Sequence, residues 1–257
     1  MPDTQRTAVI TGAGAPRGIG KATAARLARD GWAVAVLDLN EPAAKEAADE
    51  IAAGTGAPVF AHGVDVADEP SVLAAYRAVR AEVDAGRLPT VGAVVNIAGI
   101  TSPVPFLETT LELWNKVMAV NATGTYLVTK AFLPDLIEAR WGRIVNMSSV
   151  SAQQGGGVFG RTPYSSAKAA ILGFTKALAR ELGDAGVTVN AVAPGAVDTD
   201  IRVGTTEELE AAIVKSIPIG RQATVADVAG VIAWLTSEDA GYLQGTTIDI
   251  NGGSFLH

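Results

Sequence analysis

The 257-residue chain contains no cysteine, which excludes disulfides, thiolate metal sites and a cysteine nucleophile. Histidine is nearly absent too, because only His62 and His257 occur. His62 lies in a strand-like run and His257 is the last residue, so we assign neither to a Ser-His-Asp triad or a metal site. We expect no bound metal, and any proton transfer must use another kind of side chain.

Positive charge and long apolar runs are also scarce. The 20 basic residues are outnumbered by 27 acidic ones, and the net charge of −7 argues against nucleic acid or an anionic membrane as partner. No apolar run reaches the roughly 18 residues of a membrane span. The stretch "MPDTQRTAVI" lacks the apolar core of a signal peptide. We therefore expect a cytoplasmic protein that acts on a small molecule.

What the chain does have is a regular alternation of apolar runs and helical patterns. The apolar runs of strand length are 7–11, 33–38, 58–64, 91–96, 143–147, 187–192 and 246–250. The helical patterns are 18–30, 42–53, 71–84, 110–140, 163–183 and 224–236. This alternation predicts an α/β fold, a single Rossmann-type doubly wound parallel sheet of about seven strands with helices on both faces. No linker or repeat divides the chain, so we expect one domain over 1–257.

A glycine-rich loop joins the first predicted strand to the first predicted helix. In "AVITGAGAPRGIGKATAARLA" the glycines at 12, 14, 18 and 20 allow a tight turn and a close approach of the backbone to a pyrophosphate. The N–H groups at the start of the following helix would face that anion. The loop predicts a dinucleotide site, although ordinary strand–helix turns also carry glycines.

Two charged residues bear on which dinucleotide binds. Asp38 ends the second predicted strand, where a carboxylate accepts hydrogen bonds from the adenosine ribose and repels a 2′-phosphate. Arg17, inside the glycine loop, would instead pair with a phosphate. The position of Asp38 is the better defined, so we expect NAD in preference to NADP.

The third predicted strand ends in a further acid, in "GVDVAD". Asp65 would accept a hydrogen bond from the adenine amino group, and Val66 would contribute its backbone. The alternative is that Asp65 caps the next helix, but Asp68 and Ser71 are better placed for that.

The stretch "TPYSSAK" places Tyr164 and Lys168 four residues apart in a helical pattern, and thus on one helix face. A neighbouring ammonium favours the phenolate and lowers the tyrosine pKa from about 10 toward working pH. Tyr164 can then serve as a general acid/base without any histidine. Ser165 and Lys168 also match the S-x-x-K pattern of serine acylases, but the S-D-N and K-T-G strings of that class are missing.

Several short motifs follow one another in a recognisable order. They are "TGAGAPRGIG" (11–20), "NIAG" (96–99), "VNATG" (120–124), "IVNMSS" (144–149), "YSSAK" (164–168), "PGAVDT" (194–199) and "INGG" (250–253). With them the chain resembles the short-chain dehydrogenase/reductase family over essentially its full length. The resemblance implies that Ser149 orients the substrate oxygen and that Tyr164 is the acid/base. Lys168 would hold the nicotinamide ribose, and Asn121 would hold a water in a proton relay.

The resemblance also implies a set of cofactor-binding residues spread along the chain. They are Gly12, Gly14, Arg17, Gly18, Ile19, Gly20, Asp38, Leu39, Asp65, Val66, Asn96, Ala98, Gly99, Tyr164, Lys168, Pro194, Gly195, Val197 and Thr199. The chain departs from the commonest pattern at three places. The glycine loop is longer by Ala15 and Pro16, Ile97 replaces an asparagine, and the loop before Tyr164 is long. The last departure leaves Ser149 and Ser151 as alternative catalytic serines.

The segment 195–222 interrupts the alternation with a polar excursion, which is usually functional or mobile in a compact domain. We expect it to line a substrate pocket together with other loop residues, namely Thr101, Ser151, Gln153, Val158 and Phe159. Their mixed character leaves polyol, hydroxyacyl and cyclic alcohol substrates open.

The leading hypothesis is an NAD(H)-dependent oxidoreductase that interconverts a secondary alcohol and a ketone. The alternative is a dinucleotide-binding regulator or scaffold without catalysis, which the intact candidate residues argue against. The pattern 163–183 is small or apolar around most of its circumference through Leu178, so more than one side should be buried. The resemblance implies a homotetramer built through this helix, the pattern 110–140 and the C-terminal strand.

Overall fold

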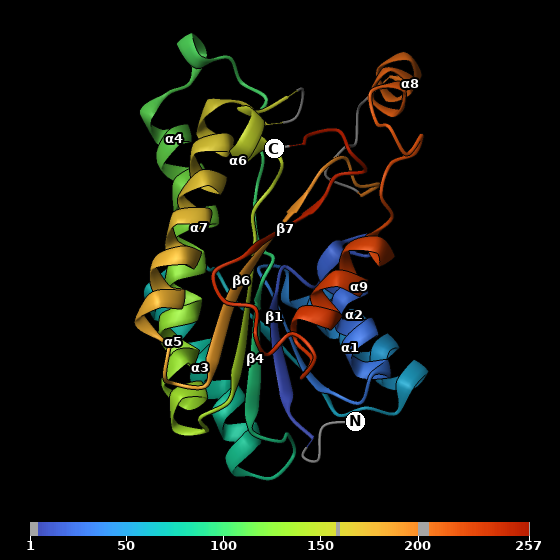
Figure 1. Cartoon of the computed structure of the whole chain (residues 1–257). Helices are drawn as coiled ribbons and strands as arrows, with labels where there is room; N and C mark the ends of the chain where they lie inside the picture. Colours follow the sequence, from blue (N-terminus) through green and yellow to red (C-terminus); the bar gives the residue numbers. More distant parts are fainter. Residues whose placement is uncertain (1–4, 158–159, 200–205, 257) are drawn as a thin grey trace.

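The computed structural model describes residues 5–157, 160–199 and 206–256 (Figure 1). Within these ranges seven strands form one parallel sheet in the order β3-β2-β1-β4-β5-β6-β7. The strands are β1 Thr7–Thr11, β2 Ala33–Asp38, β3 Val59–Gly63, β4 Val91–Asn96, β5 Gly142–Met147, β6 Val187–Pro194 and β7 Thr247–Ile250. The predicted α/β doubly wound sheet is confirmed.

Helices cover both faces of the sheet (Figure 1). One face carries α1 Ile19–Arg29, α2 Glu41–Thr55 and α9 Val225–Leu235, and the other α3 Glu69–Asp84, α5 Gly124–Glu138 and α7 Thr162–Glu181. In β1, Ile10 belongs to the core that contains Leu27 of α1, whereas Val9 belongs to the core that contains Phe132 of α5. Both faces of each central strand are therefore buried, which explains why the strands are apolar on almost every residue.

Polar side chains fix where several helices begin. Asn40 caps α2 by accepting from the Ala43 N–H, and Asp68 caps α3 by accepting from the Ser71 N–H. Each cap satisfies a backbone donor that the helix leaves free. The expectation that Asp68, rather than Asp65, caps the third helix is confirmed.

The pattern 110–140 is not one regular helix, and this part of the prediction is wrong. It consists of α4 Leu111–Met118, a π-helical turn Ala119–Thr123 and α5. The Asn121 side-chain amide donates to the Val117 carbonyl at 2.9 Å, where a regular helix would place the backbone N–H of residue 121. The side chain thus competes with the helix ladder at this turn, and such π-turns are frequent at functional sites.

The excursion 195–222 contains a helix that the sequence analysis did not predict, α8 Glu207–Lys215. Thr206 caps it by accepting from the Leu209 N–H. Three glutamates in the first turn stabilise the helix, because their negative charges lie at the positive end of its dipole. Two other short helices were also missed, the 3₁₀ turn η1 Phe106–Glu108 and α6 Ser151–Gln154. Residues 200–205 of the excursion lie outside the described residues.

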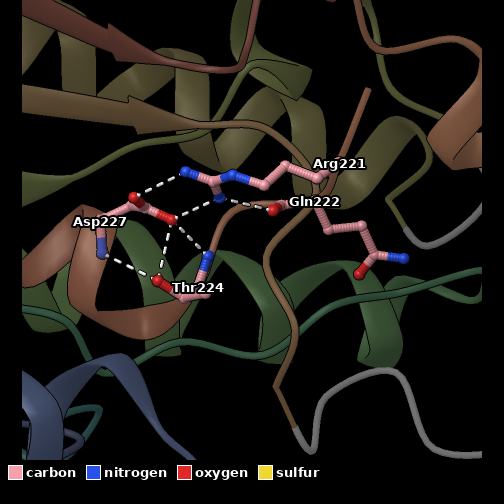
Figure 2. A network of polar contacts seen from close by, with 4 residues as sticks. All are labelled: Arg221, Gln222, Thr224 and Asp227. Carbon is pink, nitrogen blue, oxygen red and sulfur yellow. Dashed lines mark hydrogen bonds and ion pairs between the residues drawn. The ribbon is translucent and has the colours of Figure 1, made fainter. Parts of the chain in front are cut away.

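A network of polar contacts fixes the end of this excursion (Figure 2). Arg221 donates to both carboxylate oxygens of Asp227, at 2.7 and 3.0 Å, while Thr224 donates to the same carboxylate and caps α9. These hydrogen bonds hold the pKa of Asp227 well below its usual range. Gln222 donates to Glu210 of α8. The network therefore ties α8 to the start of α9.

None of the helices that the structure describes is long and apolar enough to span a lipid bilayer.

Candidate active site

A cavity of about 720 Å³ opens at the carboxyl ends of the central strands. The strand order reverses between β1 and β4, and at such a point the loops diverge and leave a crevice for a ligand. The glycine loop lines one side of the cavity through Ala15, Gly18 and Ile19. Many of the other predicted site residues also line the cavity, namely Gly99, Thr101, Asn121, Ser149, Ser151, Tyr164, Lys168, Pro194, Gly195, Val197 and Thr199.

The glycine loop has the shape that a pyrophosphate requires. Gly12 has a positive φ of 67°, and a Cβ there would lie 2.8 Å from the Ala98 Cα. A Cβ on Gly20 would lie 2.1 Å from the Gly12 carbonyl oxygen, so α1 packs directly on the loop. No side chain among the described residues caps α1, and its first turn holds no acid. Its N–H groups are thus available to an anion, and the loop fits a dinucleotide.

Asp38 is held rigidly at the end of β2. One carboxylate oxygen accepts from the Gly14 N–H at 2.8 Å and the other accepts from the Asn40 N–H at 3.0 Å. An ionised carboxylate has further lone pairs beyond these two. Asp38 can therefore accept hydrogen bonds from a ribose next to the glycine loop.

Arg17 reaches across the crevice rather than toward Asp38. Its guanidinium donates to the Asp198 carboxylate at 2.6 Å, and both side chains are mostly exposed. Asp198 follows β6, which lies on the opposite side of β1 from β2. The ion pair therefore bridges the glycine loop and the loop after β6 and draws Arg17 away from the expected ribose position.

Three other expected cofactor residues have side chains that are hydrogen-bonded to nearby protein groups or exposed to solvent. Asp65 is exposed and accepts from the Ala67 N–H at 2.9 Å. Asn96 is buried, and its amide donates to Thr129 and Asn146 at 2.9 and 2.8 Å. Leu39 is largely exposed. For these residues a cofactor contact stays a prediction, and for Asn96 it would have to come from the backbone.

Tyr164 and Ser149 meet inside the cavity. Ser149 is buried, and its hydrogen bond with the Tyr164 hydroxyl lowers the tyrosine pKa. Burial has the larger effect, so the net pKa of Tyr164 lies above its usual value. The expectation that the neighbouring ammonium lowers this pKa is wrong for this arrangement.

Lys168 explains why that expectation fails. Its side chain is only 2% exposed, and Nζ donates to the Met147 carbonyl at 2.7 Å and lies 5.6 Å from the Tyr164 ring centroid. Burial disfavours the charged ammonium and lowers the pKa of Lys168 to about 7. Near neutral pH the amine is thus only partly protonated, a state suited to exchanging protons.

Asn121 presents a buried acceptor to the same space. Its amide donates to the Ile100 and Val117 carbonyls at 2.9 Å each, and no described group donates to Oδ1. A Cβ on Gly99 would lie 2.6 Å from that Oδ1 and 3.3 Å from the Lys168 Nζ. Glycine at 99 therefore leaves open a polar space between the amide and the amine, where an ordered water fits.

The three clustered serines have different partners. Ser148 donates to the Lys168 carbonyl at 2.9 Å and so anchors α7. The Ser149 oxygen accepts from the Ser151 N–H at 3.1 Å, while Ser151 begins α6 and lines the cavity. Both Ser149 and Ser151 line the cavity, and Ser149 is the serine whose hydroxyl lowers the pKa of Tyr164.

The expected substrate residues are only partly brought together. Gln153 donates to Asp249 at 2.8 Å, whereas its neighbour Gln154 lines the cavity. A substrate contact for Gln153 stays a prediction. Val158 and Phe159 lie outside the described residues.

The excursion 195–222 lines the cavity, as the sequence predicts, through Ile213 of α8 and through Ser216 and Ile217, which follow that helix. Ser254 also lines the cavity and was not among the expected residues. No group of three or more metal-ligating side chains occurs in the described ranges.

A family model described as "Enoyl-(Acyl carrier protein) reductase" matches residues 12–254. A Sinorhizobium fredii protein called an uncharacterized short-chain type dehydrogenase/reductase is 41% identical over 98% of each chain. The 3-oxoacyl-[acyl-carrier-protein] reductase of Aquifex aeolicus is 42% identical, covering 94% of this chain and 95% of its own. The acetoacetyl-CoA reductase of Cupriavidus necator is 39% identical, covering 97% and 98%.

The fold and the site define a dinucleotide-binding oxidoreductase. The chain belongs to the short-chain dehydrogenase/reductase family, as its motifs predict.

Proposed function

We propose that the protein is an NAD(H)-dependent oxidoreductase that interconverts a secondary alcohol and a ketone, with Tyr164 as general acid/base. The observation that carries the proposal is that Ser149, Tyr164 and Lys168 line one cavity together with the glycine loop, with the Ser149 hydroxyl near enough to lower the pKa of Tyr164. Two hydroxyl groups that meet in this way can both bond one substrate oxygen. The bound nicotinamide supplies or accepts the hydride.

The side chains divide the remaining work. Ser149 orients the substrate oxygen, and Tyr164 donates a proton to it in reduction and accepts one in oxidation. Lys168, with a pKa of about 7, returns the proton near neutral pH. The free acceptor of Asn121 holds the water through which that proton exchanges with solvent.

NAD rather than NADP is the proposed cofactor. Asp38 stands beside the glycine loop, where its negative charge repels a 2′-phosphate. Arg17, the residue that would favour such a phosphate, is paired with Asp198 across the crevice. Charge and geometry thus support the same preference.

The proposed substrate is a 3-oxoacyl thioester or the matching 3-hydroxyacyl thioester. Among the described residues that line the cavity only Lys168 carries a charge, and its amine is buried and bonded to the Met147 carbonyl, so the cavity offers no exposed cation to pair with a free carboxylate and a neutral reacting end fits better. Ile213, Ile217 and Val197 offer apolar contacts to an acyl chain. Relatives are named for 3-oxoacyl, acetoacetyl-CoA and 3-hydroxyacyl-CoA substrates. The hydroxyl pair suits protonation of an oxygen, which favours ketone over enoyl reduction despite the name of the family model.

The test is NADH oxidation with acetoacetyl-CoA, crotonyl-CoA, a ketose and cyclohexanone, each beside the Tyr164→Phe variant. We expect turnover of acetoacetyl-CoA, little with the others, and loss of that turnover in the variant. Preferred turnover of crotonyl-CoA would indicate enoyl reduction instead. NADH binding without turnover of any compound would favour the catalytically silent regulator or scaffold.

We also propose a homotetramer in the cytoplasm. Along α7 the small residues Ala169, Ala170, Gly173 and Ala177 are exposed in the monomer, and a Cβ on Gly173 would meet nothing within 4 Å. A face of small side chains allows the close approach of a helix from a second copy.

A further inference from the structure

The ring of Tyr164 lies directly against a residue that neither the motifs nor the proposed mechanism uses. A Cβ added to Gly160 would lie 2.3 Å from the Tyr164 Cδ1, 3.0 Å from Cε1 and 3.2 Å from Cγ. Real Cβ atoms essentially never approach another heavy atom closer than 3.0 Å. The tyrosine ring therefore occupies the space that any other residue at 160 would need for its side chain.

Gly160 is held from two directions. It forms an isolated parallel bridge with Ser102, and the neighbouring Arg161 N–H donates to the Ser102 carbonyl at 3.0 Å. On its other side its carbonyl accepts from the Gly157 N–H at 2.9 Å. A Cβ on Gly156, whose φ is 110°, would lie 2.4 Å from that carbonyl oxygen. With the backbone at 160 fixed in this way, a methyl group there would move the ring and not the loop.

The position of the ring decides where the phenol oxygen lies. Ordinary contact begins at 3.4 Å, so the ring would have to shift by about 1 Å to accept a methyl group at 160. The hydrogen bond between the Tyr164 hydroxyl and Ser149 does not survive such a shift without rearrangement. A misplacement of this size costs a reaction roughly 10²-fold in rate.

We propose that Gly160 is the positioning residue for Tyr164, the surface against which the catalytic ring is held in line with Ser149. This inference rests on the proposed role of Tyr164. It assigns a functional reason to the glycine that ends the long loop before α7. The loop is then part of the site's geometry and not only a connection.

The experiment compares Gly160→Ala with Gly183→Ala. Gly183 is the matched control, because it follows the other end of α7, does not line the cavity, has a φ outside the left-handed region, and a Cβ there would make only an ordinary contact of 3.6 Å with the Arg180 carbonyl oxygen. For Gly160→Ala we expect kcat with acetoacetyl-CoA to fall roughly 10²-fold. NADH affinity, measured by fluorescence titration, should stay unchanged, and Gly183→Ala should match the wild type in both.

A pH profile separates positioning from general damage. In the oxidative direction the phenolate is the base, so activity rises with pH through the apparent pKa of Tyr164. Gly160→Ala should raise that apparent pKa, because the hydrogen bond from Ser149 that lowers it is lost. If Gly160→Ala keeps the wild-type kcat and pH profile, the proposal is wrong. Should Tyr164→Phe itself remain active, the fault lies with the proposed function instead.

A stability measurement keeps the proposal testable even if Gly160→Ala folds poorly. Thermal unfolding is followed for Gly160→Ala alone and in a Tyr164→Ala background, where the obstructing ring is gone. We expect the alanine at 160 to lower Tm in the wild-type background and to have little effect in the second. An equal loss of Tm in both backgrounds would show that something other than the ring requires glycine, and would overturn the inference.

Discussion

Replacing Lys168 by methionine should make the protein more stable at neutral pH while abolishing its activity. Burial lowers the pKa of this lysine from 10.5 to about 7, so between these values the unfolded chain binds more protons than the folded one. Burying the amine therefore lowers the free energy of unfolding. This loss of stability is full below pH 7 and disappears as the pH rises toward 10.5. Methionine has a similar length and carries no charge, so the variant escapes the penalty.

The pKa shift sets the magnitude. At 1.36 kcal/mol per pKa unit, holding Lys168 in the folded state costs about 4 kcal/mol at pH 7 and about 2 kcal/mol at pH 9. Removing the amine leaves the Met147 carbonyl without its donor, which costs about 1–3 kcal/mol in return. We expect Lys168→Met to be more stable by about 1–3 kcal/mol at pH 7, with an advantage about 2 kcal/mol smaller at pH 9.

Urea unfolding at pH 7 and pH 9 measures this difference. Lys176→Met on the same helix is the control, because Lys176 is exposed and its replacement should change stability little at either pH. A Lys168→Met variant that is less stable than the wild type at pH 7, by an amount that does not change at pH 9, would refute the reasoning.

Three further outcomes test other parts of the site and the assembly. The kcat/KM should be higher with NADH than with NADPH, and Asp38→Asn should lower the ratio of these two values. A wild-type preference for NADPH would mean that Arg17 governs the choice of cofactor. Ser149→Ala should lower kcat by about 10²-fold or more, whereas Ser151→Ala should keep most of it, and the reverse result would assign catalysis to Ser151. Light scattering should report a tetramer at micromolar concentration, against which a stable monomer would count.

The sheet was predictable from sequence because its central strands are buried on both faces. All seven predicted runs became strands, with ends that moved by at most two residues. The break in the pattern 110–140 was not predictable from apolar spacing, because it depends on where the side chain of Asn121 donates. Spacing alone does reveal that Tyr164 and Lys168 share a helix face.

The energetics of the site required the structure. The sign of the Tyr164 pKa shift depends on the burial of the phenol and of Lys168, which spacing does not give. The hydrogen bond from Gln153 to Asp249 depends on the short helix α6, and the contact of Gly160 with the tyrosine ring depends on a loop with no repeating pattern. These features depend on how distant segments of the chain pack together, and therefore leave little signal in local sequence.

The most direct test of the proposed chemistry is the rate of acetoacetyl-CoA reduction by Tyr164→Phe, measured beside its affinity for NADH. Phenylalanine keeps the ring against Gly160 and removes only the transferable proton. General acid/base catalysis contributes about 10²–10⁴-fold, so kcat should fall at least that far while the NADH dissociation constant stays close to wild type. A variant that keeps more than about a tenth of the wild-type kcat would contradict the assignment of Tyr164 as the proton donor.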